Sequence, residues 1–129
     1  MPIHIVESEF FAEFLSNLNS DFHLPSRRKV MKDLDVICKI GKADLTNILR
    51  EVSYVATTAD SWTGHNRSFL GMTVHWINAN TLKREKAVLA CRELSVSQTS
   101  TVLANNITDI HQQFGIQHKV SKNQYEIIT

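Results

Sequence analysis

The hydrophobic pattern of this chain changes its period near residue 53. Before that point, apolar residues recur at the spacing of amphipathic helices, and after it they gather in short β-favouring runs separated by polar breaks. A chain with both patterns needs a fold that buries helix and sheet together. The sequence therefore predicts two parts, a helical lead-in segment at residues 1–52 and an α/β region at residues 53–129.

The lead-in segment contains three amphipathic stretches. The first runs from Phe11 to Leu18, and its phenylalanines are expected to be core residues. The second begins after Pro25, with Ser26 as a plausible N-cap, and Gly41 would end it. The third covers residues 45–52, so three helices are expected.

The sequence of the second part predicts three strands, a helix and the start of a fourth strand. The first run, Tyr54–Ala59, has little charge and suits a strand buried on both faces. After the helix at residues 103–114, capped by Ser97 or Thr99 and ended by Gly115, a fourth strand could begin. Short turns favour antiparallel pairing of the first three strands, whereas a strand after a crossover helix returns parallel to a neighbour. The expected segments are a turn at Ser61–Arg67, a strand at Ser68–Ile77, a hairpin connection at Asn78–Thr81, a strand at Lys83–Leu94 and a final strand at Tyr125–Thr129.

Charge, cysteines and hydropathy exclude several classes of protein. The net charge is +1, from 14 basic and 13 acidic residues, which is too balanced to predict nucleic-acid binding from bulk charge. Cys38 and Cys91 are expected to be free buried thiols, with a rare structural disulfide as the alternative. No apolar run approaches the ~18 residues that span a bilayer, and the N-terminus lacks signal-peptide features. A cytosolic or nuclear protein without membrane contact is expected.

The most informative segment is Ala56–Thr63, in which Asp60 ends a β-favouring run and is followed by Ser61, Trp62 and Thr63. Together with Ser68–Ile77 it resembles the hAT transposase superfamily and its relatives that contain BED zinc fingers. The stretches Ile107–Ile116 and Leu24–Arg28 are similar to further parts of the same family, so the resemblance covers roughly residues 8 to 122.

The resemblance implies a ribonuclease H-like domain that cuts phosphodiesters with two divalent metals, Mg²⁺ or Mn²⁺, held by carboxylates. Asp60 would be the first of these metal ligands and catalytic acids. The second acid normally lies in a Thr-Asp-Asn motif on the strand after the helix, which this sequence lacks, and Glu126 stands near that position in a different context. The third acid and the Cys-x-x-Cys pair of a BED finger are also missing. One carboxylate cannot hold two metals, so we expect no nuclease activity, no bound metal and no small-molecule cofactor.

Several of these residues also have alternative interpretations. Asp60 could simply cap a turn, and Trp62 is expected to pack rather than stack on a base. The histidines are expected to be structural or exposed, although His65 lies just after Asp60. A small basic cluster at a helix start forms either a solvated face or a contact to DNA phosphates. Its residues are Arg27, Arg28, Lys29 and Lys32.

Three functions follow from these observations, in decreasing order of support. The first is a fragment of a transposon-derived nuclear DNA-binding protein that is inactive as an enzyme. The second is a small interaction module on a ribonuclease H-like scaffold. The third is an intact enzyme that uses Asp60. It has little support, because the sequence contains no Gly-rich phosphate loop, no Gly-x-Ser-x-Gly elbow and no paired carboxylate motif. A ribonuclease H-like sheet normally has five strands with helices on both faces. A shorter sheet would leave a strand edge and an apolar face uncovered, so marginal stability or self-association is also expected.

Overall fold

A computed structural model describes residues 3–94, 99–121 and 127–128 of the chain. The chain divides into two compact units, Met1–Gly41 and Lys42–Thr129. The division falls inside the long helix α2 (Arg27–Glu51), upstream of the boundary at residues 52 and 53 that the change of period suggests. The last turns of α2 lie with the sheet, because Leu49 is fully buried in the core of the second unit.

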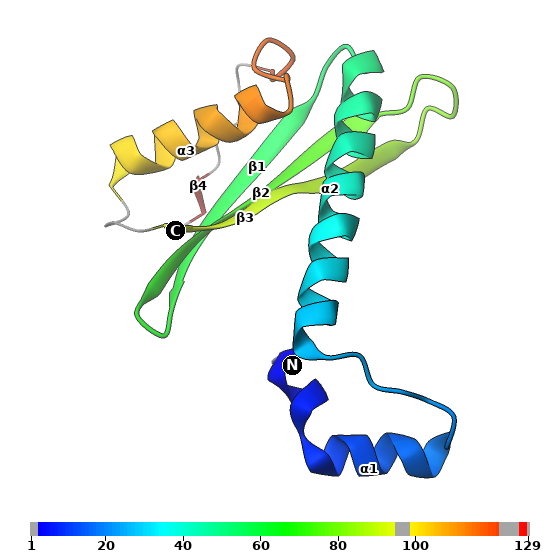
Figure 1. The fold of residues 1–129 in the computed structure, drawn as a ribbon. Coiled ribbons are helices and arrows are strands. Elements are labelled where there is room, and N and C mark those ends of the chain that lie inside the picture. The colour runs from blue at the N-terminus through cyan, green and yellow to red at the C-terminus, as the bar shows by residue number, and fades with distance from the viewer. Residues whose placement is uncertain (1–2, 95–98, 122–126, 129) are drawn as a thin grey trace. The chain divides into compact units, whose positions relative to one another are not determined.

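The helical unit contains a short 3-10 helix (Ile3–Glu7), helix α1 (Glu9–Leu18) and the first part of α2 (Figure 1). Ser26 caps α2, since the backbone N–H of Lys29 donates to its hydroxyl oxygen at 3.2 Å. The prediction that Gly41 ends a helix is wrong, because α2 continues through it to Glu51. A glycine inside a helix costs only about 1 kcal/mol relative to alanine, and the flanking residues can offset that cost.

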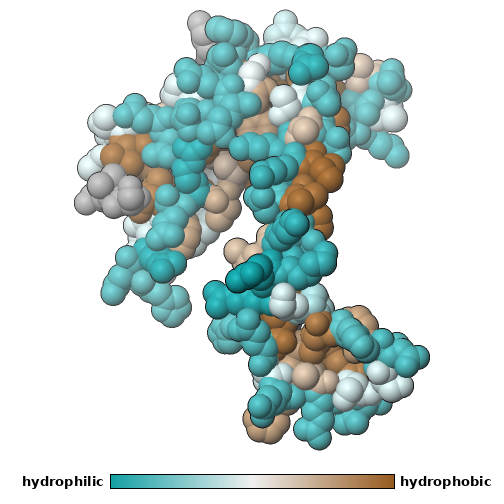
Figure 2. Space-filling model, in the orientation of Figure 1, coloured by the Kyte–Doolittle hydropathy of each residue, from teal (hydrophilic) through white to brown (hydrophobic). Residues whose placement is uncertain are grey.

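The phenylalanines of α1 are not core residues, contrary to the expectation from their spacing. Phe10 is 85% exposed and Phe14 is 58% exposed, while Phe11 is half-buried. Apolar surface is visible on the helical unit in Figure 2. A unit of this size has too little volume to enclose several large side chains, so part of its apolar stripe stays on the surface.

The second unit is a mixed four-stranded sheet in the order β3-β2-β1-β4. The first three strands pair antiparallel, and β4 pairs parallel to β1 after the crossover through helix α3. This confirms the expected α/β class and the order β-β-β-α-β (Figure 1). The elements are β1 (Ala56–Gly64), β2 (Arg67–Ile77), β3 (Arg84–Leu94), α3 (Ser100–Gln113) and β4 (Ile127–Ile128).

The first hairpin is tighter than the expected turn at residues 61–67. Strand β1 runs on to Gly64, which pairs with Arg67, and only His65 and Asn66 form the loop. Both loop residues have positive φ, 51° and 61°. Two-residue loops of this kind match the right-handed twist of the flanking strands, so the ladder extends to the loop itself.

The second hairpin and the caps of α3 are as predicted. The Asn78 carbonyl accepts from the Leu82 N–H at 2.8 Å and closes the turn at the expected place. The Thr99 hydroxyl accepts from the Val102 N–H at 3.3 Å, and Gly115 follows α3 with a φ of 66°. Ser97, the alternative cap, lies outside the described residues.

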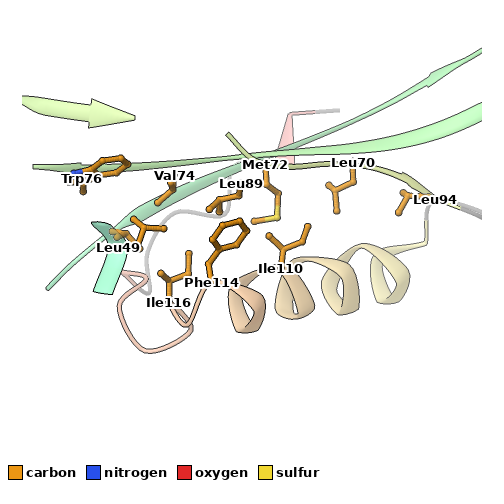
Figure 3. Close-up of a cluster of buried hydrophobic side chains, with 11 residues drawn as sticks. Leu49, Leu70, Met72, Val74, Trp76, Leu89, Leu94, Ile110, Phe114 and Ile116 are labelled. Atoms are coloured by element: carbon orange, nitrogen blue, oxygen red, sulfur yellow. The ribbon is translucent and has the colours of Figure 1, made fainter. Parts of the chain in front are cut away.

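The core lies between one face of the sheet, the last turns of α2 and helix α3. Figure 3 shows the side chains of β2 and α3 pointing toward one another. Ile110, Ile116 and Leu49 are each 0% exposed. The core residues are Leu49, Val55, Leu70, Met72, Val74, Trp76, Leu89, Leu94, Ile110, Phe114 and Ile116.

Within the described part of the second unit, no helix covers the opposite face of the sheet. The expectation that β1 is buried on both faces is therefore wrong: Thr57 is buried, whereas Thr58 and Asp60 are exposed. Side chains alternate between the two faces of a strand, so the register assigns the remaining residues to this surface. We call it the open face, and it comprises Ala56, Thr58, Asp60, Trp62, Arg67, Phe69, Gly71, Thr73, His75, Ile77, Arg84, Lys86, Val88, Cys91 and Glu93.

Candidate functional site

Asp60 lies in the middle of the open face, on an inner strand. Its backbone pairs with Gly71 of β2 on one side and with Ile128 of β4 on the other. It belongs to β1 rather than to the turn after it, so the interpretation that it caps a turn is wrong. The backbone of β1 does not require an acidic residue at this position. The exposed carboxylate of Asp60 is therefore a candidate for a functional role.

Trp62 packs beside Asp60, as its residue type suggested. Its ring stacks on Phe69, with centroids 5.7 Å apart and ring planes 21° apart. It also lies over Gly71, where an added Cβ would come within 3.0 Å of the Trp62 Cζ3 atom. The absence of a side chain at Gly71 therefore makes room for the indole beside the carboxylate.

The described residues do not supply a metal centre. Among residues 3–94, 99–121 and 127–128, no three His, Cys, Asp or Glu side chains are grouped so as to hold an ion. The residues of β4 beside Asp60 are isoleucines, and Glu126 lies outside the described residues. His65 is five residues along from Asp60, roughly 16 Å at the rise of a strand. Within these described ranges, the donors around Asp60 do not fit the two metals that the family resemblance implies.

The basic cluster predicted at a helix start belongs to the helical unit. Arg27, Arg28, Lys29 and Lys32 are all exposed in the first turns of α2. Lys29 pairs with Asp33 at 2.8 Å, and Arg28 and Lys32 lie four residues apart on one side of the helix. The cluster is thus an exposed basic surface, and within the described residues its own helix balances only part of its charge.

A second group of polar residues, not singled out from the sequence, lies at one end of the open face. Arg84 Nη2 is 3.3 Å from His75 Nδ1, and His75 Nε2 is 3.2 Å from Thr73 Oγ1. A guanidinium can only donate, so Nδ1 accepts and the ring proton is on Nε2, which donates to Thr73. Burial lowers the pKa of His75, and the charges of Arg84 and Lys86 lower it further. Alternating positive charges at the start of the expected third strand are the signal that could have revealed this group.

Two clefts lie near that end of the sheet. One, of about 410 Å³, is lined by Tyr54, His75, Ile77 and Arg84, among others. The other, of about 530 Å³, shares Tyr54, Trp76 and Ile77 with the first and is also lined by the acidic residues Glu51 and Glu85. The clefts therefore differ in charge, the first basic and the second acidic.

His111 fills a structural role. It is 5% exposed, and its Nε2 lies 3.1 Å from Thr57 Oγ1. Burial lowers its pKa, so the neutral ring is favoured. This agrees with the interpretation of the histidines as structural or exposed.

The two cysteines agree only in part with their prediction. Cys38 and Cys91 are free, as predicted, but both are exposed rather than buried. Cys91 lies on the open face of the sheet, opposite Gly71. In the part of the chain that the structure describes, no helix is long and apolar enough to cross a membrane.

Comparison with known proteins gives one consistent result. Two proteins from Zea mays, named as the AC and AC9 transposases, are each 30% identical to this chain over 121 residues, or 92% of its length. The chain spans only 15% and 14% of those relatives. No protein-family model matches the chain. The chain is therefore a distant homologue of transposases, which supports an origin in a transposable element.

Proposed function

We propose that this distant homologue of transposases is the first part of a ribonuclease H-like domain from an hAT-type, transposon-derived nuclear protein that binds DNA. The observation that carries the proposal is the position of Asp60. It stands on the central strand β1, between an antiparallel neighbour and a parallel strand that returns after a helix. Its exposure on the open face leaves the carboxylate accessible to a substrate or to metal.

The resemblance and the homology together support DNA as the partner. We assign the phosphate contacts of the helical unit to Arg27, Arg28, Lys29 and Lys32, because these side chains are exposed and positive. Contacts of this kind are independent of base sequence and weaken with salt. Binding to DNA implies the nucleus as the site of action.

We further propose that this chain has no nuclease activity. In a complete site, Asp60 would share Mg²⁺ or Mn²⁺ with further carboxylates, and the metals would supply the charge that activates the phosphodiester. Within the described residues Asp60 has no such carboxylate beside it.

The DNA contacts are tested by fluorescence anisotropy with a labelled duplex over a range of salt concentrations. The double variant R27Q/R28Q is expected to bind more weakly and to lower the slope of log affinity against log salt by about 1.8. K39Q is the matched control: Lys39 is an exposed lysine of the same helix and pairs with Asp35 at 2.7 Å. Equal binding by R27Q/R28Q and wild type would refute the assignment.

Activity is tested separately, with a cleavage assay on single- and double-stranded DNA in Mg²⁺ and in Mn²⁺. No turnover is expected. Turnover that disappears in D60N, a variant of similar size without the charge, would overturn the proposal and restore the interpretation as an enzyme.

The alternative function is a non-enzymatic interaction module on the same scaffold. The exposed apolar residues of the open face favour it, with Trp62 43% exposed, Ile77 57% and Val88 67%. This alternative predicts self-association or protein binding without salt-dependent DNA binding. Sedimentation velocity alongside the anisotropy titration distinguishes the two.

A further inference from the structure

We propose, on the basis of the DNA-binding function proposed above, that one end of the open face is a subsite for an unpaired segment of a nucleic-acid strand. This basic end comprises His75, Arg84 and Lys86 with the adjacent Tyr54. It lies on a different unit from the basic cluster of α2, so it adds a second and separate contact.

The charge distribution of the open face supports a phosphate ligand at this end. Arg84 and Lys86 are exposed, and neither takes part in an ion pair within the described residues. The neighbouring Glu85 points to the other face, where it accepts from the Asn78 side chain at 2.8 Å. Of the acidic residues of the open face, Glu93 lies at the other end and Asp60 lies in the middle.

The separation of the two ends is large on the scale of a nucleotide. Glu93 pairs with Phe69, and Lys86 pairs with His75, six residues further along β2. At about 3.3 Å per residue this is roughly 20 Å, well beyond the Debye length of about 8 Å at physiological salt. Asp60 pairs with Gly71, four residues from His75, which is roughly 13 Å at the same rise. Both distances exceed the Debye length, so the carboxylates of the open face do little to cancel the positive potential there. The nearer acids, Glu51 and Glu85, line the adjacent cleft of about 530 Å³, which Tyr54 also lines.

Hydrogen bonding holds Arg84 without neutralising it. Among the described residues, the guanidinium of Arg84 donates to the neutral imidazole of His75, which is itself hydrogen-bonded to Thr73. A guanidinium has five N–H donors, so this contact leaves donors for a phosphate. The lowered pKa of His75 agrees with this arrangement, because a protonated ring would point a donor at the arginine.

An exposed aromatic ring supplies the second element of recognition. Tyr54 is 81% exposed and lines the cleft of about 410 Å³ together with His75 and Arg84. A base can stack on such a ring only when it is not paired and stacked within a duplex. A positive groove combined with an aromatic platform is the arrangement that binds single strands with little sequence preference.

The experiment is an anisotropy titration of the full chain with a fluorescein-labelled oligo-dT of about 12 nucleotides, repeated with a duplex of equal length. Wild type is expected to prefer the single strand. R84Q/K86Q should lower the salt slope by about 1.4, since each phosphate contact on a single strand contributes about 0.7. Y54A should weaken single-strand binding about 5- to 100-fold, whereas Y54F keeps the ring and should bind like wild type.

R67Q is the matched control, because Arg67 is a cation at the opposite end of the same face and lies 3.6 Å from Glu93. It should bind like wild type. Thermal melts check that the variants remain folded, which their exposed positions favour. Binding that is unchanged in R84Q/K86Q and Y54A but lost in R27Q/R28Q overturns this inference alone. No binding to either nucleic acid overturns the proposed function as well.

A different occupant of the surface would also be revealed. If R84Q/K86Q and Y54A alter the sedimentation coefficient but leave nucleic-acid affinity unchanged, a second copy of the chain covers the basic end, and the inference is wrong. An equal loss of single-strand and duplex binding in Y54A would refute base stacking.

Discussion

The Nε2 atom of His111 lies 3.1 Å from the hydroxyl oxygen of Thr57, and both side chains are buried between α3 and β1. The contact joins the crossover helix to the strand that carries Asp60. It also places a titratable ring in the core, where its neutral form is favoured.

The free energy of unfolding should therefore depend on pH. The pKa of His111 is lowered in the folded state, so below the unfolded value of about 6.5 the unfolded chain binds more protons than the folded chain. The stabilisation is complete above that pH and is lost as the pH falls. Urea unfolding at pH 7.5, 6.0 and 5.0 should show a steady decrease in stability, and H111Q should decrease less. His75 adds in the same direction, so H75Q is the companion variant. An H111Q slope equal to that of wild type would contradict the prediction.

The core contact of Ile110 should be costly to remove. The side chain is 0% exposed and faces the buried row of β2 (Figure 3). I110A is expected to lower the free energy of unfolding by about 2–5 kcal/mol, through lost burial and a residual cavity. Q112A, at an exposed position of the same helix, should change it by less than about 0.5 kcal/mol. Chemical unfolding of both variants provides the measurement, and similar values would mean that α3 is not packed as described.

The close approach of Trp62 to Gly71 predicts a coupling between them. A Cβ at Gly71 would meet the indole at 3.0 Å, so G71A should displace the ring from Phe69 and shift its fluorescence. We expect a destabilisation on the order of 1 kcal/mol. In a W62A background the same change should cost less, because the clash is gone. Additive effects of the two substitutions in a double-mutant cycle would exclude the clash.

Lys119 should stabilise the end of α2. Its ammonium donates to the carbonyl oxygens of Leu49 and Arg50, at 2.9 and 2.7 Å. These are among the last carbonyls of the helix, which have no partners within it. K119M, which keeps most of the side-chain volume, is expected to cost about 1.5–3 kcal/mol. Q117A serves as the exposed control in the same loop. A loss no greater than that of the control would show that solvent replaces the ammonium.

Features encoded by neighbouring residues could be predicted from the sequence. The Asn78 turn and the Thr99 and Gly115 caps depend on hydrogen bonds and φ values within a few residues, and all were expected. The antiparallel and parallel pairing of the strands followed from connection length. The first hairpin was predicted too wide because Gly64 and Asn66 are typical of turns, whereas pairing with β2 keeps β1 in the ladder as far as Gly64.

The candidate site was only half visible in the sequence. Asp60 stood out through its neighbours Trp62 and Thr63. His75, Arg84 and Lys86 come from two strands, and only the register of β2 with β3 brings them together. The role of Gly71 could not be foreseen either, because it depends on the indole of the adjacent strand.

By itself, the sequence determined the element types and the chain order, because periodicity, capping and turn chemistry act over short distances. Asp60 was singled out by the resemblance of its segment to the hAT family. Only the tertiary structure decided that α2 continues past Gly41, that one face of the sheet remains open, and that Asp60 shares this face with a basic end. These outcomes depend on packing and strand register, which are set by contacts between residues distant in the sequence.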